Sequence, residues 1–210
     1  MKYIVGIDEV GRGPLAGPVA VGVLIQKQRP RLYNKGEALI SLGKIRDSKK
    51  LSAKQREGWF EIICAERQRG ALDFSVSFVS HIMIDKRGLA WALRIATVRS
   101  LARLAVPTNS EIFLDDGLRA PEIFKNQKTI IKGDEKIPVI ALASIVAKVT
   151  RDHLMIRLAK KYPQYGFEKH KGYGTKEHYR AIGKFGLCPI HRRSFLSKVP
   201  NHKFQIPNNN

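Results

Sequence analysis

The segment KYIVGIDEVGRG, residues 2–13, runs from an apolar stretch into two carboxylates and a glycine–arginine–glycine turn. Its apolar residues predict a buried strand, and Asp8 and Glu9 lie where that strand ends. Two adjacent carboxylates at the edge of a core repel each other and resist desolvation, so they need a cation or strong donors. Mg²⁺ suits them because it takes few protein carboxylates together with substrate phosphate. The segment therefore predicts a metal site, and the plainer alternative is a polar strand end that leads into a turn.

The rest of the chain alternates further strands with helices, which is typical of an α/β domain. Residues 26–50 have no clear period and predict a long loop. Ser52 is expected to cap a helix that stops at Gly70. Strands are expected at 18–25, 73–79, 111–115 and 128–132, helices at 52–69, 82–105 (one long or two short) and 137–161, and a short helix at 175–183.

The charge balance indicates a polyanionic partner. Lys and Arg number 38 against 18 Asp and Glu, which gives a formal net charge of +20 and favours nucleic acid. A ribosomal or chromatin-type binder would share this charge, so charge alone does not indicate an enzyme. Residues 160–203 hold eleven Lys or Arg and two acids. We therefore expect a main domain over 1–160, a basic helical extension over 161–203 packed on it, and a frayed tail over 204–210.

Several protein classes are disfavoured by what the sequence lacks. No stretch approaches the ~18 uninterrupted apolar residues of a membrane span, and the first residues lack a signal pattern. Cys64 and Cys188 are too few and too isolated for a disulfide framework or a zinc cluster. We expect a soluble, cytoplasmic protein.

Two further acidic positions resemble the first pair in context. EIFLDDG, residues 111–117, is again a short apolar strand that ends in carboxylates and a glycine, and IIKGDEK, residues 130–136, places Asp134 just before a helix. Taken singly, Asp115 or Asp116 could open a turn and Asp134 could cap a helix. Taken together in an acid-poor chain, the three strand ends predict one metal site assembled from distant segments.

Seven segments, in this order along the chain, resemble the ribonuclease HII family, the bacterial type of the type 2 ribonucleases H. The segments span nearly the whole chain, so the resemblance covers most of it. They are GIDEVGRGPLAGPV (6–19), DSKKLS (47–52), DG (116–117), KGD (132–134), ASIVAKVTRD (143–152), YPQYGFEKHKGYGT (162–175) and HRRSF (191–195).

The resemblance implies a ribonuclease H-like fold, with a mixed five-stranded sheet flanked by helices and a helical C-terminal extension. It implies cleavage of RNA in RNA–DNA hybrids and incision 5′ to single ribonucleotides embedded in duplex DNA, with Mg²⁺ or Mn²⁺. Two metal ions would serve an in-line attack of water that leaves 5′-phosphate and 3′-hydroxyl ends. The family's four catalytic, metal-binding acids match Asp8, Glu9, Asp116 and Asp134.

The acid at Asp115 departs from the family pattern, because the residue before the third aspartate is usually apolar. It leaves the choice between Asp115 and Asp116 open. Asp152 is the main rival to Asp134, although its place inside a long helix beside Arg151 favours a structural ion pair.

The substrate-binding residues also follow from the resemblance. Recognition must use the 2′-hydroxyl, which alone separates RNA from DNA at the scissile position. Tyr173 would read the RNA–DNA junction with the GRG backbone, and its alternative role is an aromatic between extension and core. One of Lys49 and Lys50 is expected to contact a phosphate and the other to be a solvated lysine, and Lys49 is taken as the contact. His178 and His191 are interpreted as packing or phosphate-binding residues. The expected substrate-binding set is Gly11, Arg12, Gly13, Lys49 and Tyr173.

Two other function classes remain open at this stage. A non-catalytic nucleic-acid-binding protein of the same fold would share the charge, but it gains nothing from a negative cluster that faces phosphates. A DNA-cutting nuclease or integrase of the same superfamily is disfavoured by the GRG and GYG segments. The expected partners are RNA–DNA hybrid and ribonucleotide-containing duplex DNA, bound by a monomer.

Overall fold

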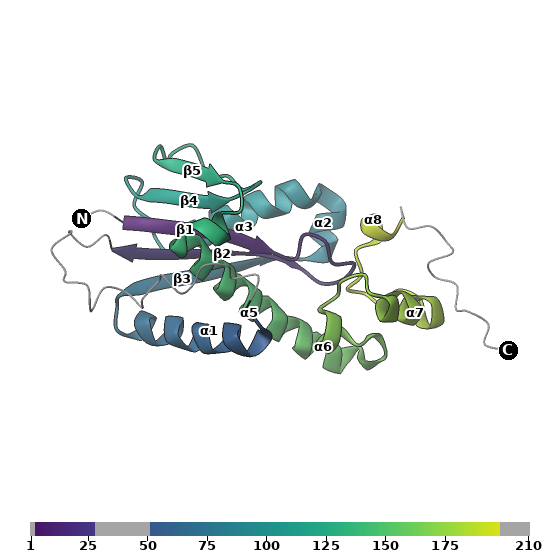
Figure 1. Cartoon of the computed structure of the whole chain (residues 1–210). Coiled ribbons are helices and arrows are strands. Elements are labelled where there is room, and N and C mark those ends of the chain that lie inside the picture. The colour runs from purple at the N-terminus through teal and green to yellow at the C-terminus, as the bar shows by residue number, and fades with distance from the viewer. Residues whose placement is uncertain (1–2, 28–50, 198–210) are drawn as a thin grey trace.

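The computed structural model of the chain describes residues 3–27 and 51–197, and a five-stranded sheet lies at its centre (Figure 1). The order of strands across the sheet is β3-β2-β1-β4-β5. β1 and β2 are antiparallel, as are β2 and β3, whereas β1–β4 and β4–β5 are parallel, so the sheet is mixed. The strands are β1 (Tyr3–Val10), β2 (Val19–Lys27), β3 (Leu72–Val79), β4 (Glu111–Asp115) and β5 (Gln127–Ile130).

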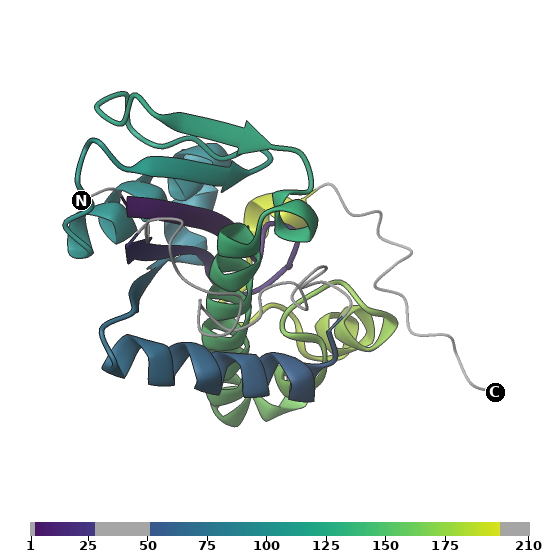
Figure 2. The ribbon, with the colours of Figure 1, turned by 60° about the vertical axis from the view of Figure 1, so that its left-hand side comes forward.

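Helices cover both faces of this sheet (Figure 2). The long helix α5 packs on β1 and β2, with α1 beside it, and α3 packs on β2 and β3. α5 approaches closely because Gly6 and Gly22 have no side chain: a Cβ on Gly22 would lie 2.6 Å from the Ala143 carbonyl oxygen. The helices are α1 (Ala53–Gln68), α2 (His81–Arg87), α3 (Leu89–Arg103), α4 (Gly133–Lys136), α5 (Pro138–Lys161), η3 (Pro163–Tyr165), α6 (Phe167–His170), α7 (Lys176–Phe185) and α8 (Arg193–Leu196).

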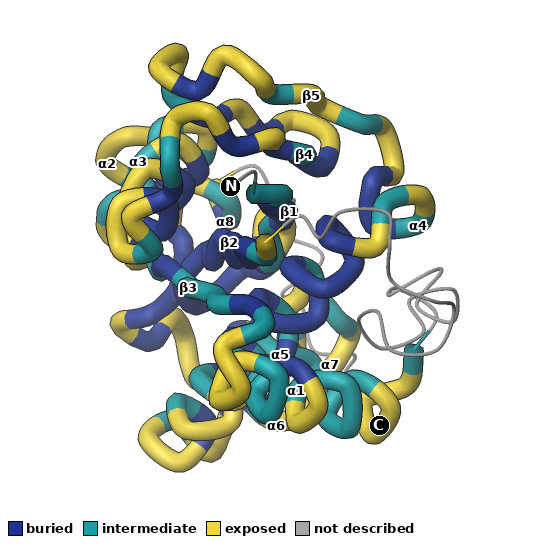
Figure 3. Tube along the Cα trace, turned by 90° about the vertical axis from the view of Figure 1, so that its left-hand side faces the viewer, coloured by how far each residue is buried: buried dark blue, intermediate teal, exposed yellow. Residues whose placement is uncertain are grey.

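Three apolar clusters form the core, and the buried part of the trace runs through the sheet and the inner helices (Figure 3). One cluster lies between the sheet and α2–α3, and a second lies between the sheet and α1–α5. The third joins the end of α5 to the C-terminal helices and includes Leu15 and Ala16 from the β1–β2 connection. The C-terminal helices therefore pack directly against the loop that follows the GRG segment.

Most of the expected elements are found, with small shifts at their ends. Ser52 caps α1 through a capping box with Gln55, as expected. The segment 82–105 divides into α2 and α3 at Gly88, whose φ of 83° no helix accommodates. β5 ends two residues early because Lys132, at φ 53°, turns the chain into α4. The segment expected to hold one short helix, 161–197, holds η3, α6, α7 and α8.

Some expectations fall on residues that the structure does not describe. The loop predicted over residues 26–50 starts later than expected, because β2 continues to Lys27, and its remainder over 28–50, with Lys49, lies outside the described residues. The tail over 204–210 also lies outside them. The division into a domain over 1–160 and an extension over 161–203 stays a prediction. Within the described ranges, no helix is both long enough and apolar enough to cross a membrane.

Candidate active site

The strand register brings two of the carboxylates together. In the parallel pair of β1 and β4, Ile7 lies opposite Leu114, so Asp8 and Asp115 occupy the next matched positions. Matched positions on neighbouring strands point to the same face, and successive residues alternate between faces. Asp8, Glu9 and Asp115 each offer a carboxylate oxygen within 4.8 Å of the others. The structure thus assembles three carboxylates at the end of β1 and β4.

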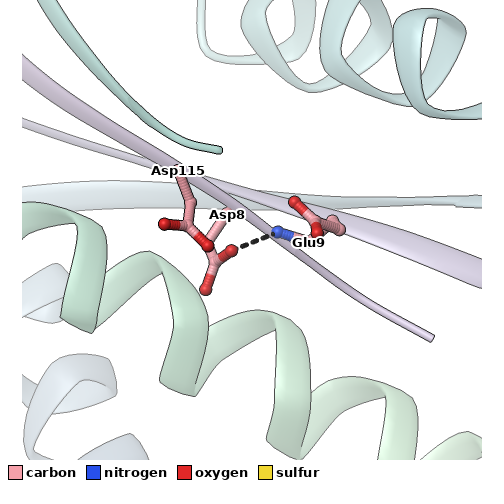
Figure 4. A group of neighbouring side chains, drawn as sticks. All are labelled: Asp8, Glu9 and Asp115. Carbon is pink, nitrogen blue, oxygen red and sulfur yellow. Dashed lines mark hydrogen bonds between the residues drawn. The ribbon is translucent and has the colours of Figure 1, made fainter. Parts of the chain in front are cut away.

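Glu9 joins this cluster although it follows Asp8 directly in the strand. Its side chain leaves β1 in a different direction from the side chains of Asp8 and Asp115, which lie next to each other (Figure 4). β4 ends at Asp115, the position that matches Asp8, so Glu9 and Val10 of β1 extend beyond β4. Glu9 therefore lies past the end of the neighbouring strand, where its carboxylate reaches the same site as that of Asp8.

Asp8 lies in a strongly unfavourable position for an anion. Its side chain is buried, and its Oδ1 accepts a hydrogen bond from the Glu9 N–H at 2.7 Å. Burial raises the pKa of Asp8 well above its ordinary value, the charges of Glu9 and Asp115 raise it further, and a hydrogen bond with Ser144 lowers it. A bound cation would relieve this repulsion, and three carboxylates are the donor type that Mg²⁺ and Mn²⁺ prefer. The residues present therefore fit a divalent metal.

Asp8→Asn should raise the stability of the metal-free protein at pH 7, because burial and the charges of Glu9 and Asp115 disfavour the ionised carboxyl in the folded state. A carboxyl whose pKa is higher in the folded state destabilises the fold as pH rises through that pKa, and Asn removes this loss. Thermal unfolding in EDTA and in excess Mg²⁺ measures both effects, because Mg²⁺ should stabilise the wild type far more than the variant. The matched control is Asp116→Asn, at an exposed carboxylate, which should leave both values unchanged. A wild type that Mg²⁺ does not stabilise would contradict a metal site here.

Asp115 and Asp134 are linked by the turn that begins α4. The Gly133 N–H donates to Asp115 Oδ1 at 2.7 Å, which ties the end of β4 to α4. Asp134 follows Gly133, and its side chain is fully buried. It is not one of the three residues whose oxygens lie within 4.8 Å of one another. Asp134 therefore directly follows the residue that binds Asp115, but it lies outside the cluster of Asp8, Glu9 and Asp115.

Asp116, the third acid expected from the LDDG motif, is exposed and lies outside the cluster. It lines a different pocket, with Gly117 and Leu118, and its backbone carbonyl accepts a long hydrogen bond, 3.4 Å, from Arg12 Nη1. β4 ends at Asp115, and Asp116 is the first residue of the turn that follows, so its side chain is not held at the strand end beside Asp8. Of the two alternatives left open by the sequence, the structure brings Asp115 to the site.

The GRG segment and Tyr173 border the carboxylates in one pocket of about 320 Å³. Arg12 Nη1 lies 3.2 Å from Glu9 Oε1, and a Cβ on Gly13 would lie 4.0 Å from Tyr173 Cε1. Tyr173 is 37% exposed, so its ring is available to a ligand. The pocket is lined by Asp8, Glu9, Val10, Gly11, Arg12, Gly13, Arg56, Asp115, Ser144, Ile145, Lys148 and Tyr173.

Three polar residues of this lining were not predicted from the sequence: Arg56, Ser144 and Lys148. Lys148 Nζ lies 5.9 Å from the centre of the Tyr173 ring and 2.9 Å from Asp152 Oδ1. Burial lowers the pKa of Lys148, and its bond with Asp152 opposes that shift. The helical ion pair expected for Asp152 is therefore present, with Lys148 four residues before it as the partner. Lys148 lies inside ASIVAKVTRD, one of the segments that resemble the family, and this position could have indicated that it belongs to the site.

Two fully buried arginines, also missed, hold the loop that follows β1. Arg151 donates to the carbonyls of Ala16, Pro18 and Lys171, and Arg192 donates to those of Gly11, Arg12 and Gly17. In a trans peptide the C=O and N–H point in opposite directions, so the N–H groups of Arg12 and Gly13 face away from Arg192. Arg192 thus fixes the GRG backbone through its carbonyls, and the N–H groups of Arg12 and Gly13 point away from Arg192. Arg151 lies in ASIVAKVTRD and Arg192 lies in HRRSF, two of the segments that resemble the family.

The family model of ribonuclease HII matches residues 5–198 of this chain. The chain belongs to the ribonuclease HII family. Ribonuclease HII of Clostridioides difficile is 43% identical over 94% of this chain and 71% of the relative. Ribonuclease HII of Endomicrobium trichonymphae is 46% identical over 91% of this chain and 84% of the relative. The resemblance seen in the sequence is confirmed.

Solved structures of ribonucleases H share the fold. A chain from the PCNA:RNase HII complex of Archaeoglobus fulgidus is 27% identical, with a TM-score of 0.71 and 97% of each chain covered. Ribonuclease H2 of Pyrococcus horikoshii is 25% identical, with a TM-score of 0.62 and coverage of 96% of this chain and 98% of that one. The expected α/β ribonuclease H-like fold, with a mixed five-stranded sheet, is confirmed for this ribonuclease HII family member.

Proposed function

We propose that this chain is a metal-dependent endoribonuclease that hydrolyses the RNA strand of RNA–DNA hybrids and incises 5′ to single ribonucleotides in duplex DNA. The observation that carries the proposal is the single pocket that joins Asp8, Glu9 and Asp115 to the GRG segment and Tyr173. One side of this pocket supplies anionic metal ligands, and the other supplies backbone donors and an aromatic ring. Hydrolysis at a ribonucleotide calls for metal ligands near the phosphate and for a contact with the sugar that carries the 2′-hydroxyl.

The metal ligands are proposed to be Asp8, Glu9 and Asp115, with Asp134 as the fourth acid. Mg²⁺ or Mn²⁺ bound there would lower the pKa of a water and stabilise the leaving 3′-oxygen, giving 5′-phosphate and 3′-hydroxyl ends. The raised pKa of Asp8 supports this role, because a carboxyl that burial and like charges destabilise gains most from a cation. Gly133 orients Asp115 through its N–H, so that one Asp115 oxygen is fixed before any ligand arrives.

Substrate recognition is assigned to the GRG backbone and to Tyr173. Arg192 fixes the carbonyls of Gly11 and Arg12, which leaves backbone N–H groups to donate to a 2′-hydroxyl or a phosphate. The Tyr173 ring stands across from Gly13 and offers a flat surface for the sugar beside the scissile ribonucleotide. Lys49 stays the proposed phosphate contact, and the monomeric state and cytoplasmic location stay predictions.

A non-catalytic nucleic-acid-binding role fits the charge of +20 equally well. The carboxylate cluster argues against it, because three acids in the floor of a pocket repel phosphate unless a cation is bound. The two roles separate in one assay. A duplex with one embedded ribonucleotide should be incised on its 5′ side with Mg²⁺ and left intact with EDTA, and binding without incision would favour the non-catalytic role.

Tyr173→Ala should lower kcat/KM for incision at a single ribonucleotide about 10- to 100-fold. An aromatic stacking contact contributes about 1–3 kcal/mol, and each ~1.4 kcal/mol corresponds to a factor of ten. Binding to all-DNA duplex should barely change, because lysine and arginine contacts with phosphates dominate there. Steady-state incision rates and a binding titration measure both quantities.

The matched control is Phe185→Ala, which removes an exposed aromatic from α7 outside the pocket. Its incision rate should stay within about twofold of the wild type. If an all-DNA duplex is cut as fast as one that carries a ribonucleotide, the proposed substrate is wrong.

A further inference from the structure

Three histidines, His170, His178 and His191, form a cluster next to the turn that carries Tyr173. His178 is fully buried, and His191 is 2% exposed. The ring of His170 stacks on that of His178, with 4.5 Å between the ring centres. None of the three lines the pocket of the carboxylates. His178 and His191 are therefore buried polar groups with no part in the proposed chemistry, and His170 is half-buried beside them.

Hydrogen bonds fix the tautomers of two of these rings, starting from the Tyr173 carbonyl. A carbonyl only accepts, so His178 Nδ1, 2.9 Å away, carries a proton and donates it. In the neutral ring, His178 Nε2 is then an acceptor, and His191 Nε2, at 3.1 Å, must be the donor. This leaves His191 Nδ1 as an acceptor for the Cys188 N–H at 2.9 Å. His191 Nδ1 also lies 3.2 Å from the Cys188 carbonyl, a contact that this tautomer does not use.

One arrangement of two protons thus satisfies every strong contact along the line Cys188–His191–His178–Tyr173. An added proton on His178 Nε2 would face the N–H of His191 Nε2, and two donors would then oppose each other at 3.1 Å. The pair is therefore built to be neutral. Burial lowers the pKa of His178 and of His191 to about 4 each, which is the direction this arrangement requires.

The same turn is held by further hydrogen bonds on the side of His170. His170 Nε2 donates to the Tyr165 carbonyl at 2.8 Å, and its Nδ1 accepts from the Gly172 N–H at 3.2 Å. The Gly172 carbonyl accepts from the Leu15 N–H at 2.8 Å, which joins the turn to the loop after the GRG segment. The backbone on either side of the Tyr173 ring is therefore anchored to histidines and to that loop.

We propose that His178 and His191 act as a neutral hydrogen-bonded pair that positions Tyr173 for recognition of the ribonucleotide. The proposal rests on the proposed function of Tyr173 and adds two positioning residues to it. His178 holds the Tyr173 carbonyl, and His191 holds His178 in the tautomer that can donate. Neither histidine touches the substrate, so both act only through Tyr173.

The proposal predicts loss of positioning as pH falls. The unfolded histidines have a pKa near 6.5, and the folded pair has a pKa of about 4, so the stabilisation is complete above pH ~6.5 and is lost towards pH 4. His81 and His170 act on the charge of the pair, and Tyr165 and Cys188 contact His191. Asp85 and Arg192 act in turn on His81, and Glu168, Lys171 and Glu177 act on His170. Because these neighbours also titrate or carry charge, the test does not rely on pH alone.

A double-mutant cycle with Tyr173→Ala separates positioning from general damage to the fold. His178→Leu should lower kcat/KM for incision at a single ribonucleotide about tenfold in the wild-type background, for the loss of one buried hydrogen bond. In the Tyr173→Ala background the same change should cost less than about twofold, because the ring it positions is gone. Equal losses in both backgrounds would overturn the proposal. A wild type that does not incise would instead overturn the proposed function.

His178→Asn is the conservative rescue, because its amide N–H can take the place of His178 Nδ1 as donor to the Tyr173 carbonyl. It should retain most of the activity that His178→Leu loses, and activity as low as that of the Leu variant would count against the proposal. The tautomers provide a readout that needs no variant. Long-range ¹H–¹⁵N spectra at pH 7 should show the proton of His178 on Nδ1 and that of His191 on Nε2, and the opposite assignment would overturn the pair.

Discussion

Asp115→Asn should abolish cleavage of a ribonucleotide-containing duplex, whereas Asp116→Asn should leave it nearly intact. Asp115 lies in the cluster with Asp8 and Glu9, so an amide there removes one anionic ligand from the metal site. A bound metal contributes several kcal/mol of transition-state stabilisation, and each ~1.4 kcal/mol is a factor of ten, so we expect a loss of about 10³-fold or more. Single-turnover incision rates in saturating Mg²⁺ measure this loss.

Asp116→Asn is the matched control, because it makes the same chemical change one residue away at an exposed side chain. Arg12 contacts only the backbone carbonyl of Asp116, and that contact survives the substitution. The rate should therefore change by less than about threefold. The reverse ranking, with Asp116→Asn inactive and Asp115→Asn active, would show that the LDDG motif places its ligand on the second aspartate.

The pattern of apolar residues was sufficient for most of the fold, because strand and helix periods are local properties of the chain. The end of β4 at Asp115 and the cap at Ser52 both followed from nearby residues. The choice between Asp115 and Asp116 could not be made from nearby residues. It depends on the register between β1 and β4, whose residues lie more than a hundred positions apart. A shift of one residue moves a side chain to the other face of the sheet.

The two buried arginines and the histidine pair could not be predicted from the sequence, for a different reason. Arginine is almost never fully buried unless it is paired, so the pattern gave no ground to place Arg151 or Arg192 in the core. Their acceptors are backbone carbonyls of a loop, and no sequence pattern marks a carbonyl as an acceptor. The tautomers of His178 and His191 likewise depend on contacts made across the fold.

Arg192→Met should lower the free energy of unfolding by about 2–4 kcal/mol. The substitution keeps much of the side-chain length but leaves the carbonyls of Gly11, Arg12 and Gly17 without their donor, and an unsatisfied buried acceptor costs about 1–3 kcal/mol. Relief of the buried charge offsets part of this loss, since burial and the nearby Arg151 lower the pKa of Arg192 to about 9. Urea unfolding monitored by tryptophan fluorescence measures the change.

Arg193→Met is the matched control for Arg192→Met, because the neighbouring arginine is exposed and only its backbone N–H bonds to Asp85. Its free energy of unfolding should change by less than about 0.5 kcal/mol. Arg192→Lys should fall between the two, since an ammonium keeps the charge but cannot span three carbonyls as a planar guanidinium does. Equal stabilities of the two Met variants would mean that the GRG loop keeps its shape without Arg192. Because residues 11–13 line the pocket, the stability lost at Arg192 should be accompanied by weaker discrimination between ribonucleotide and deoxyribonucleotide.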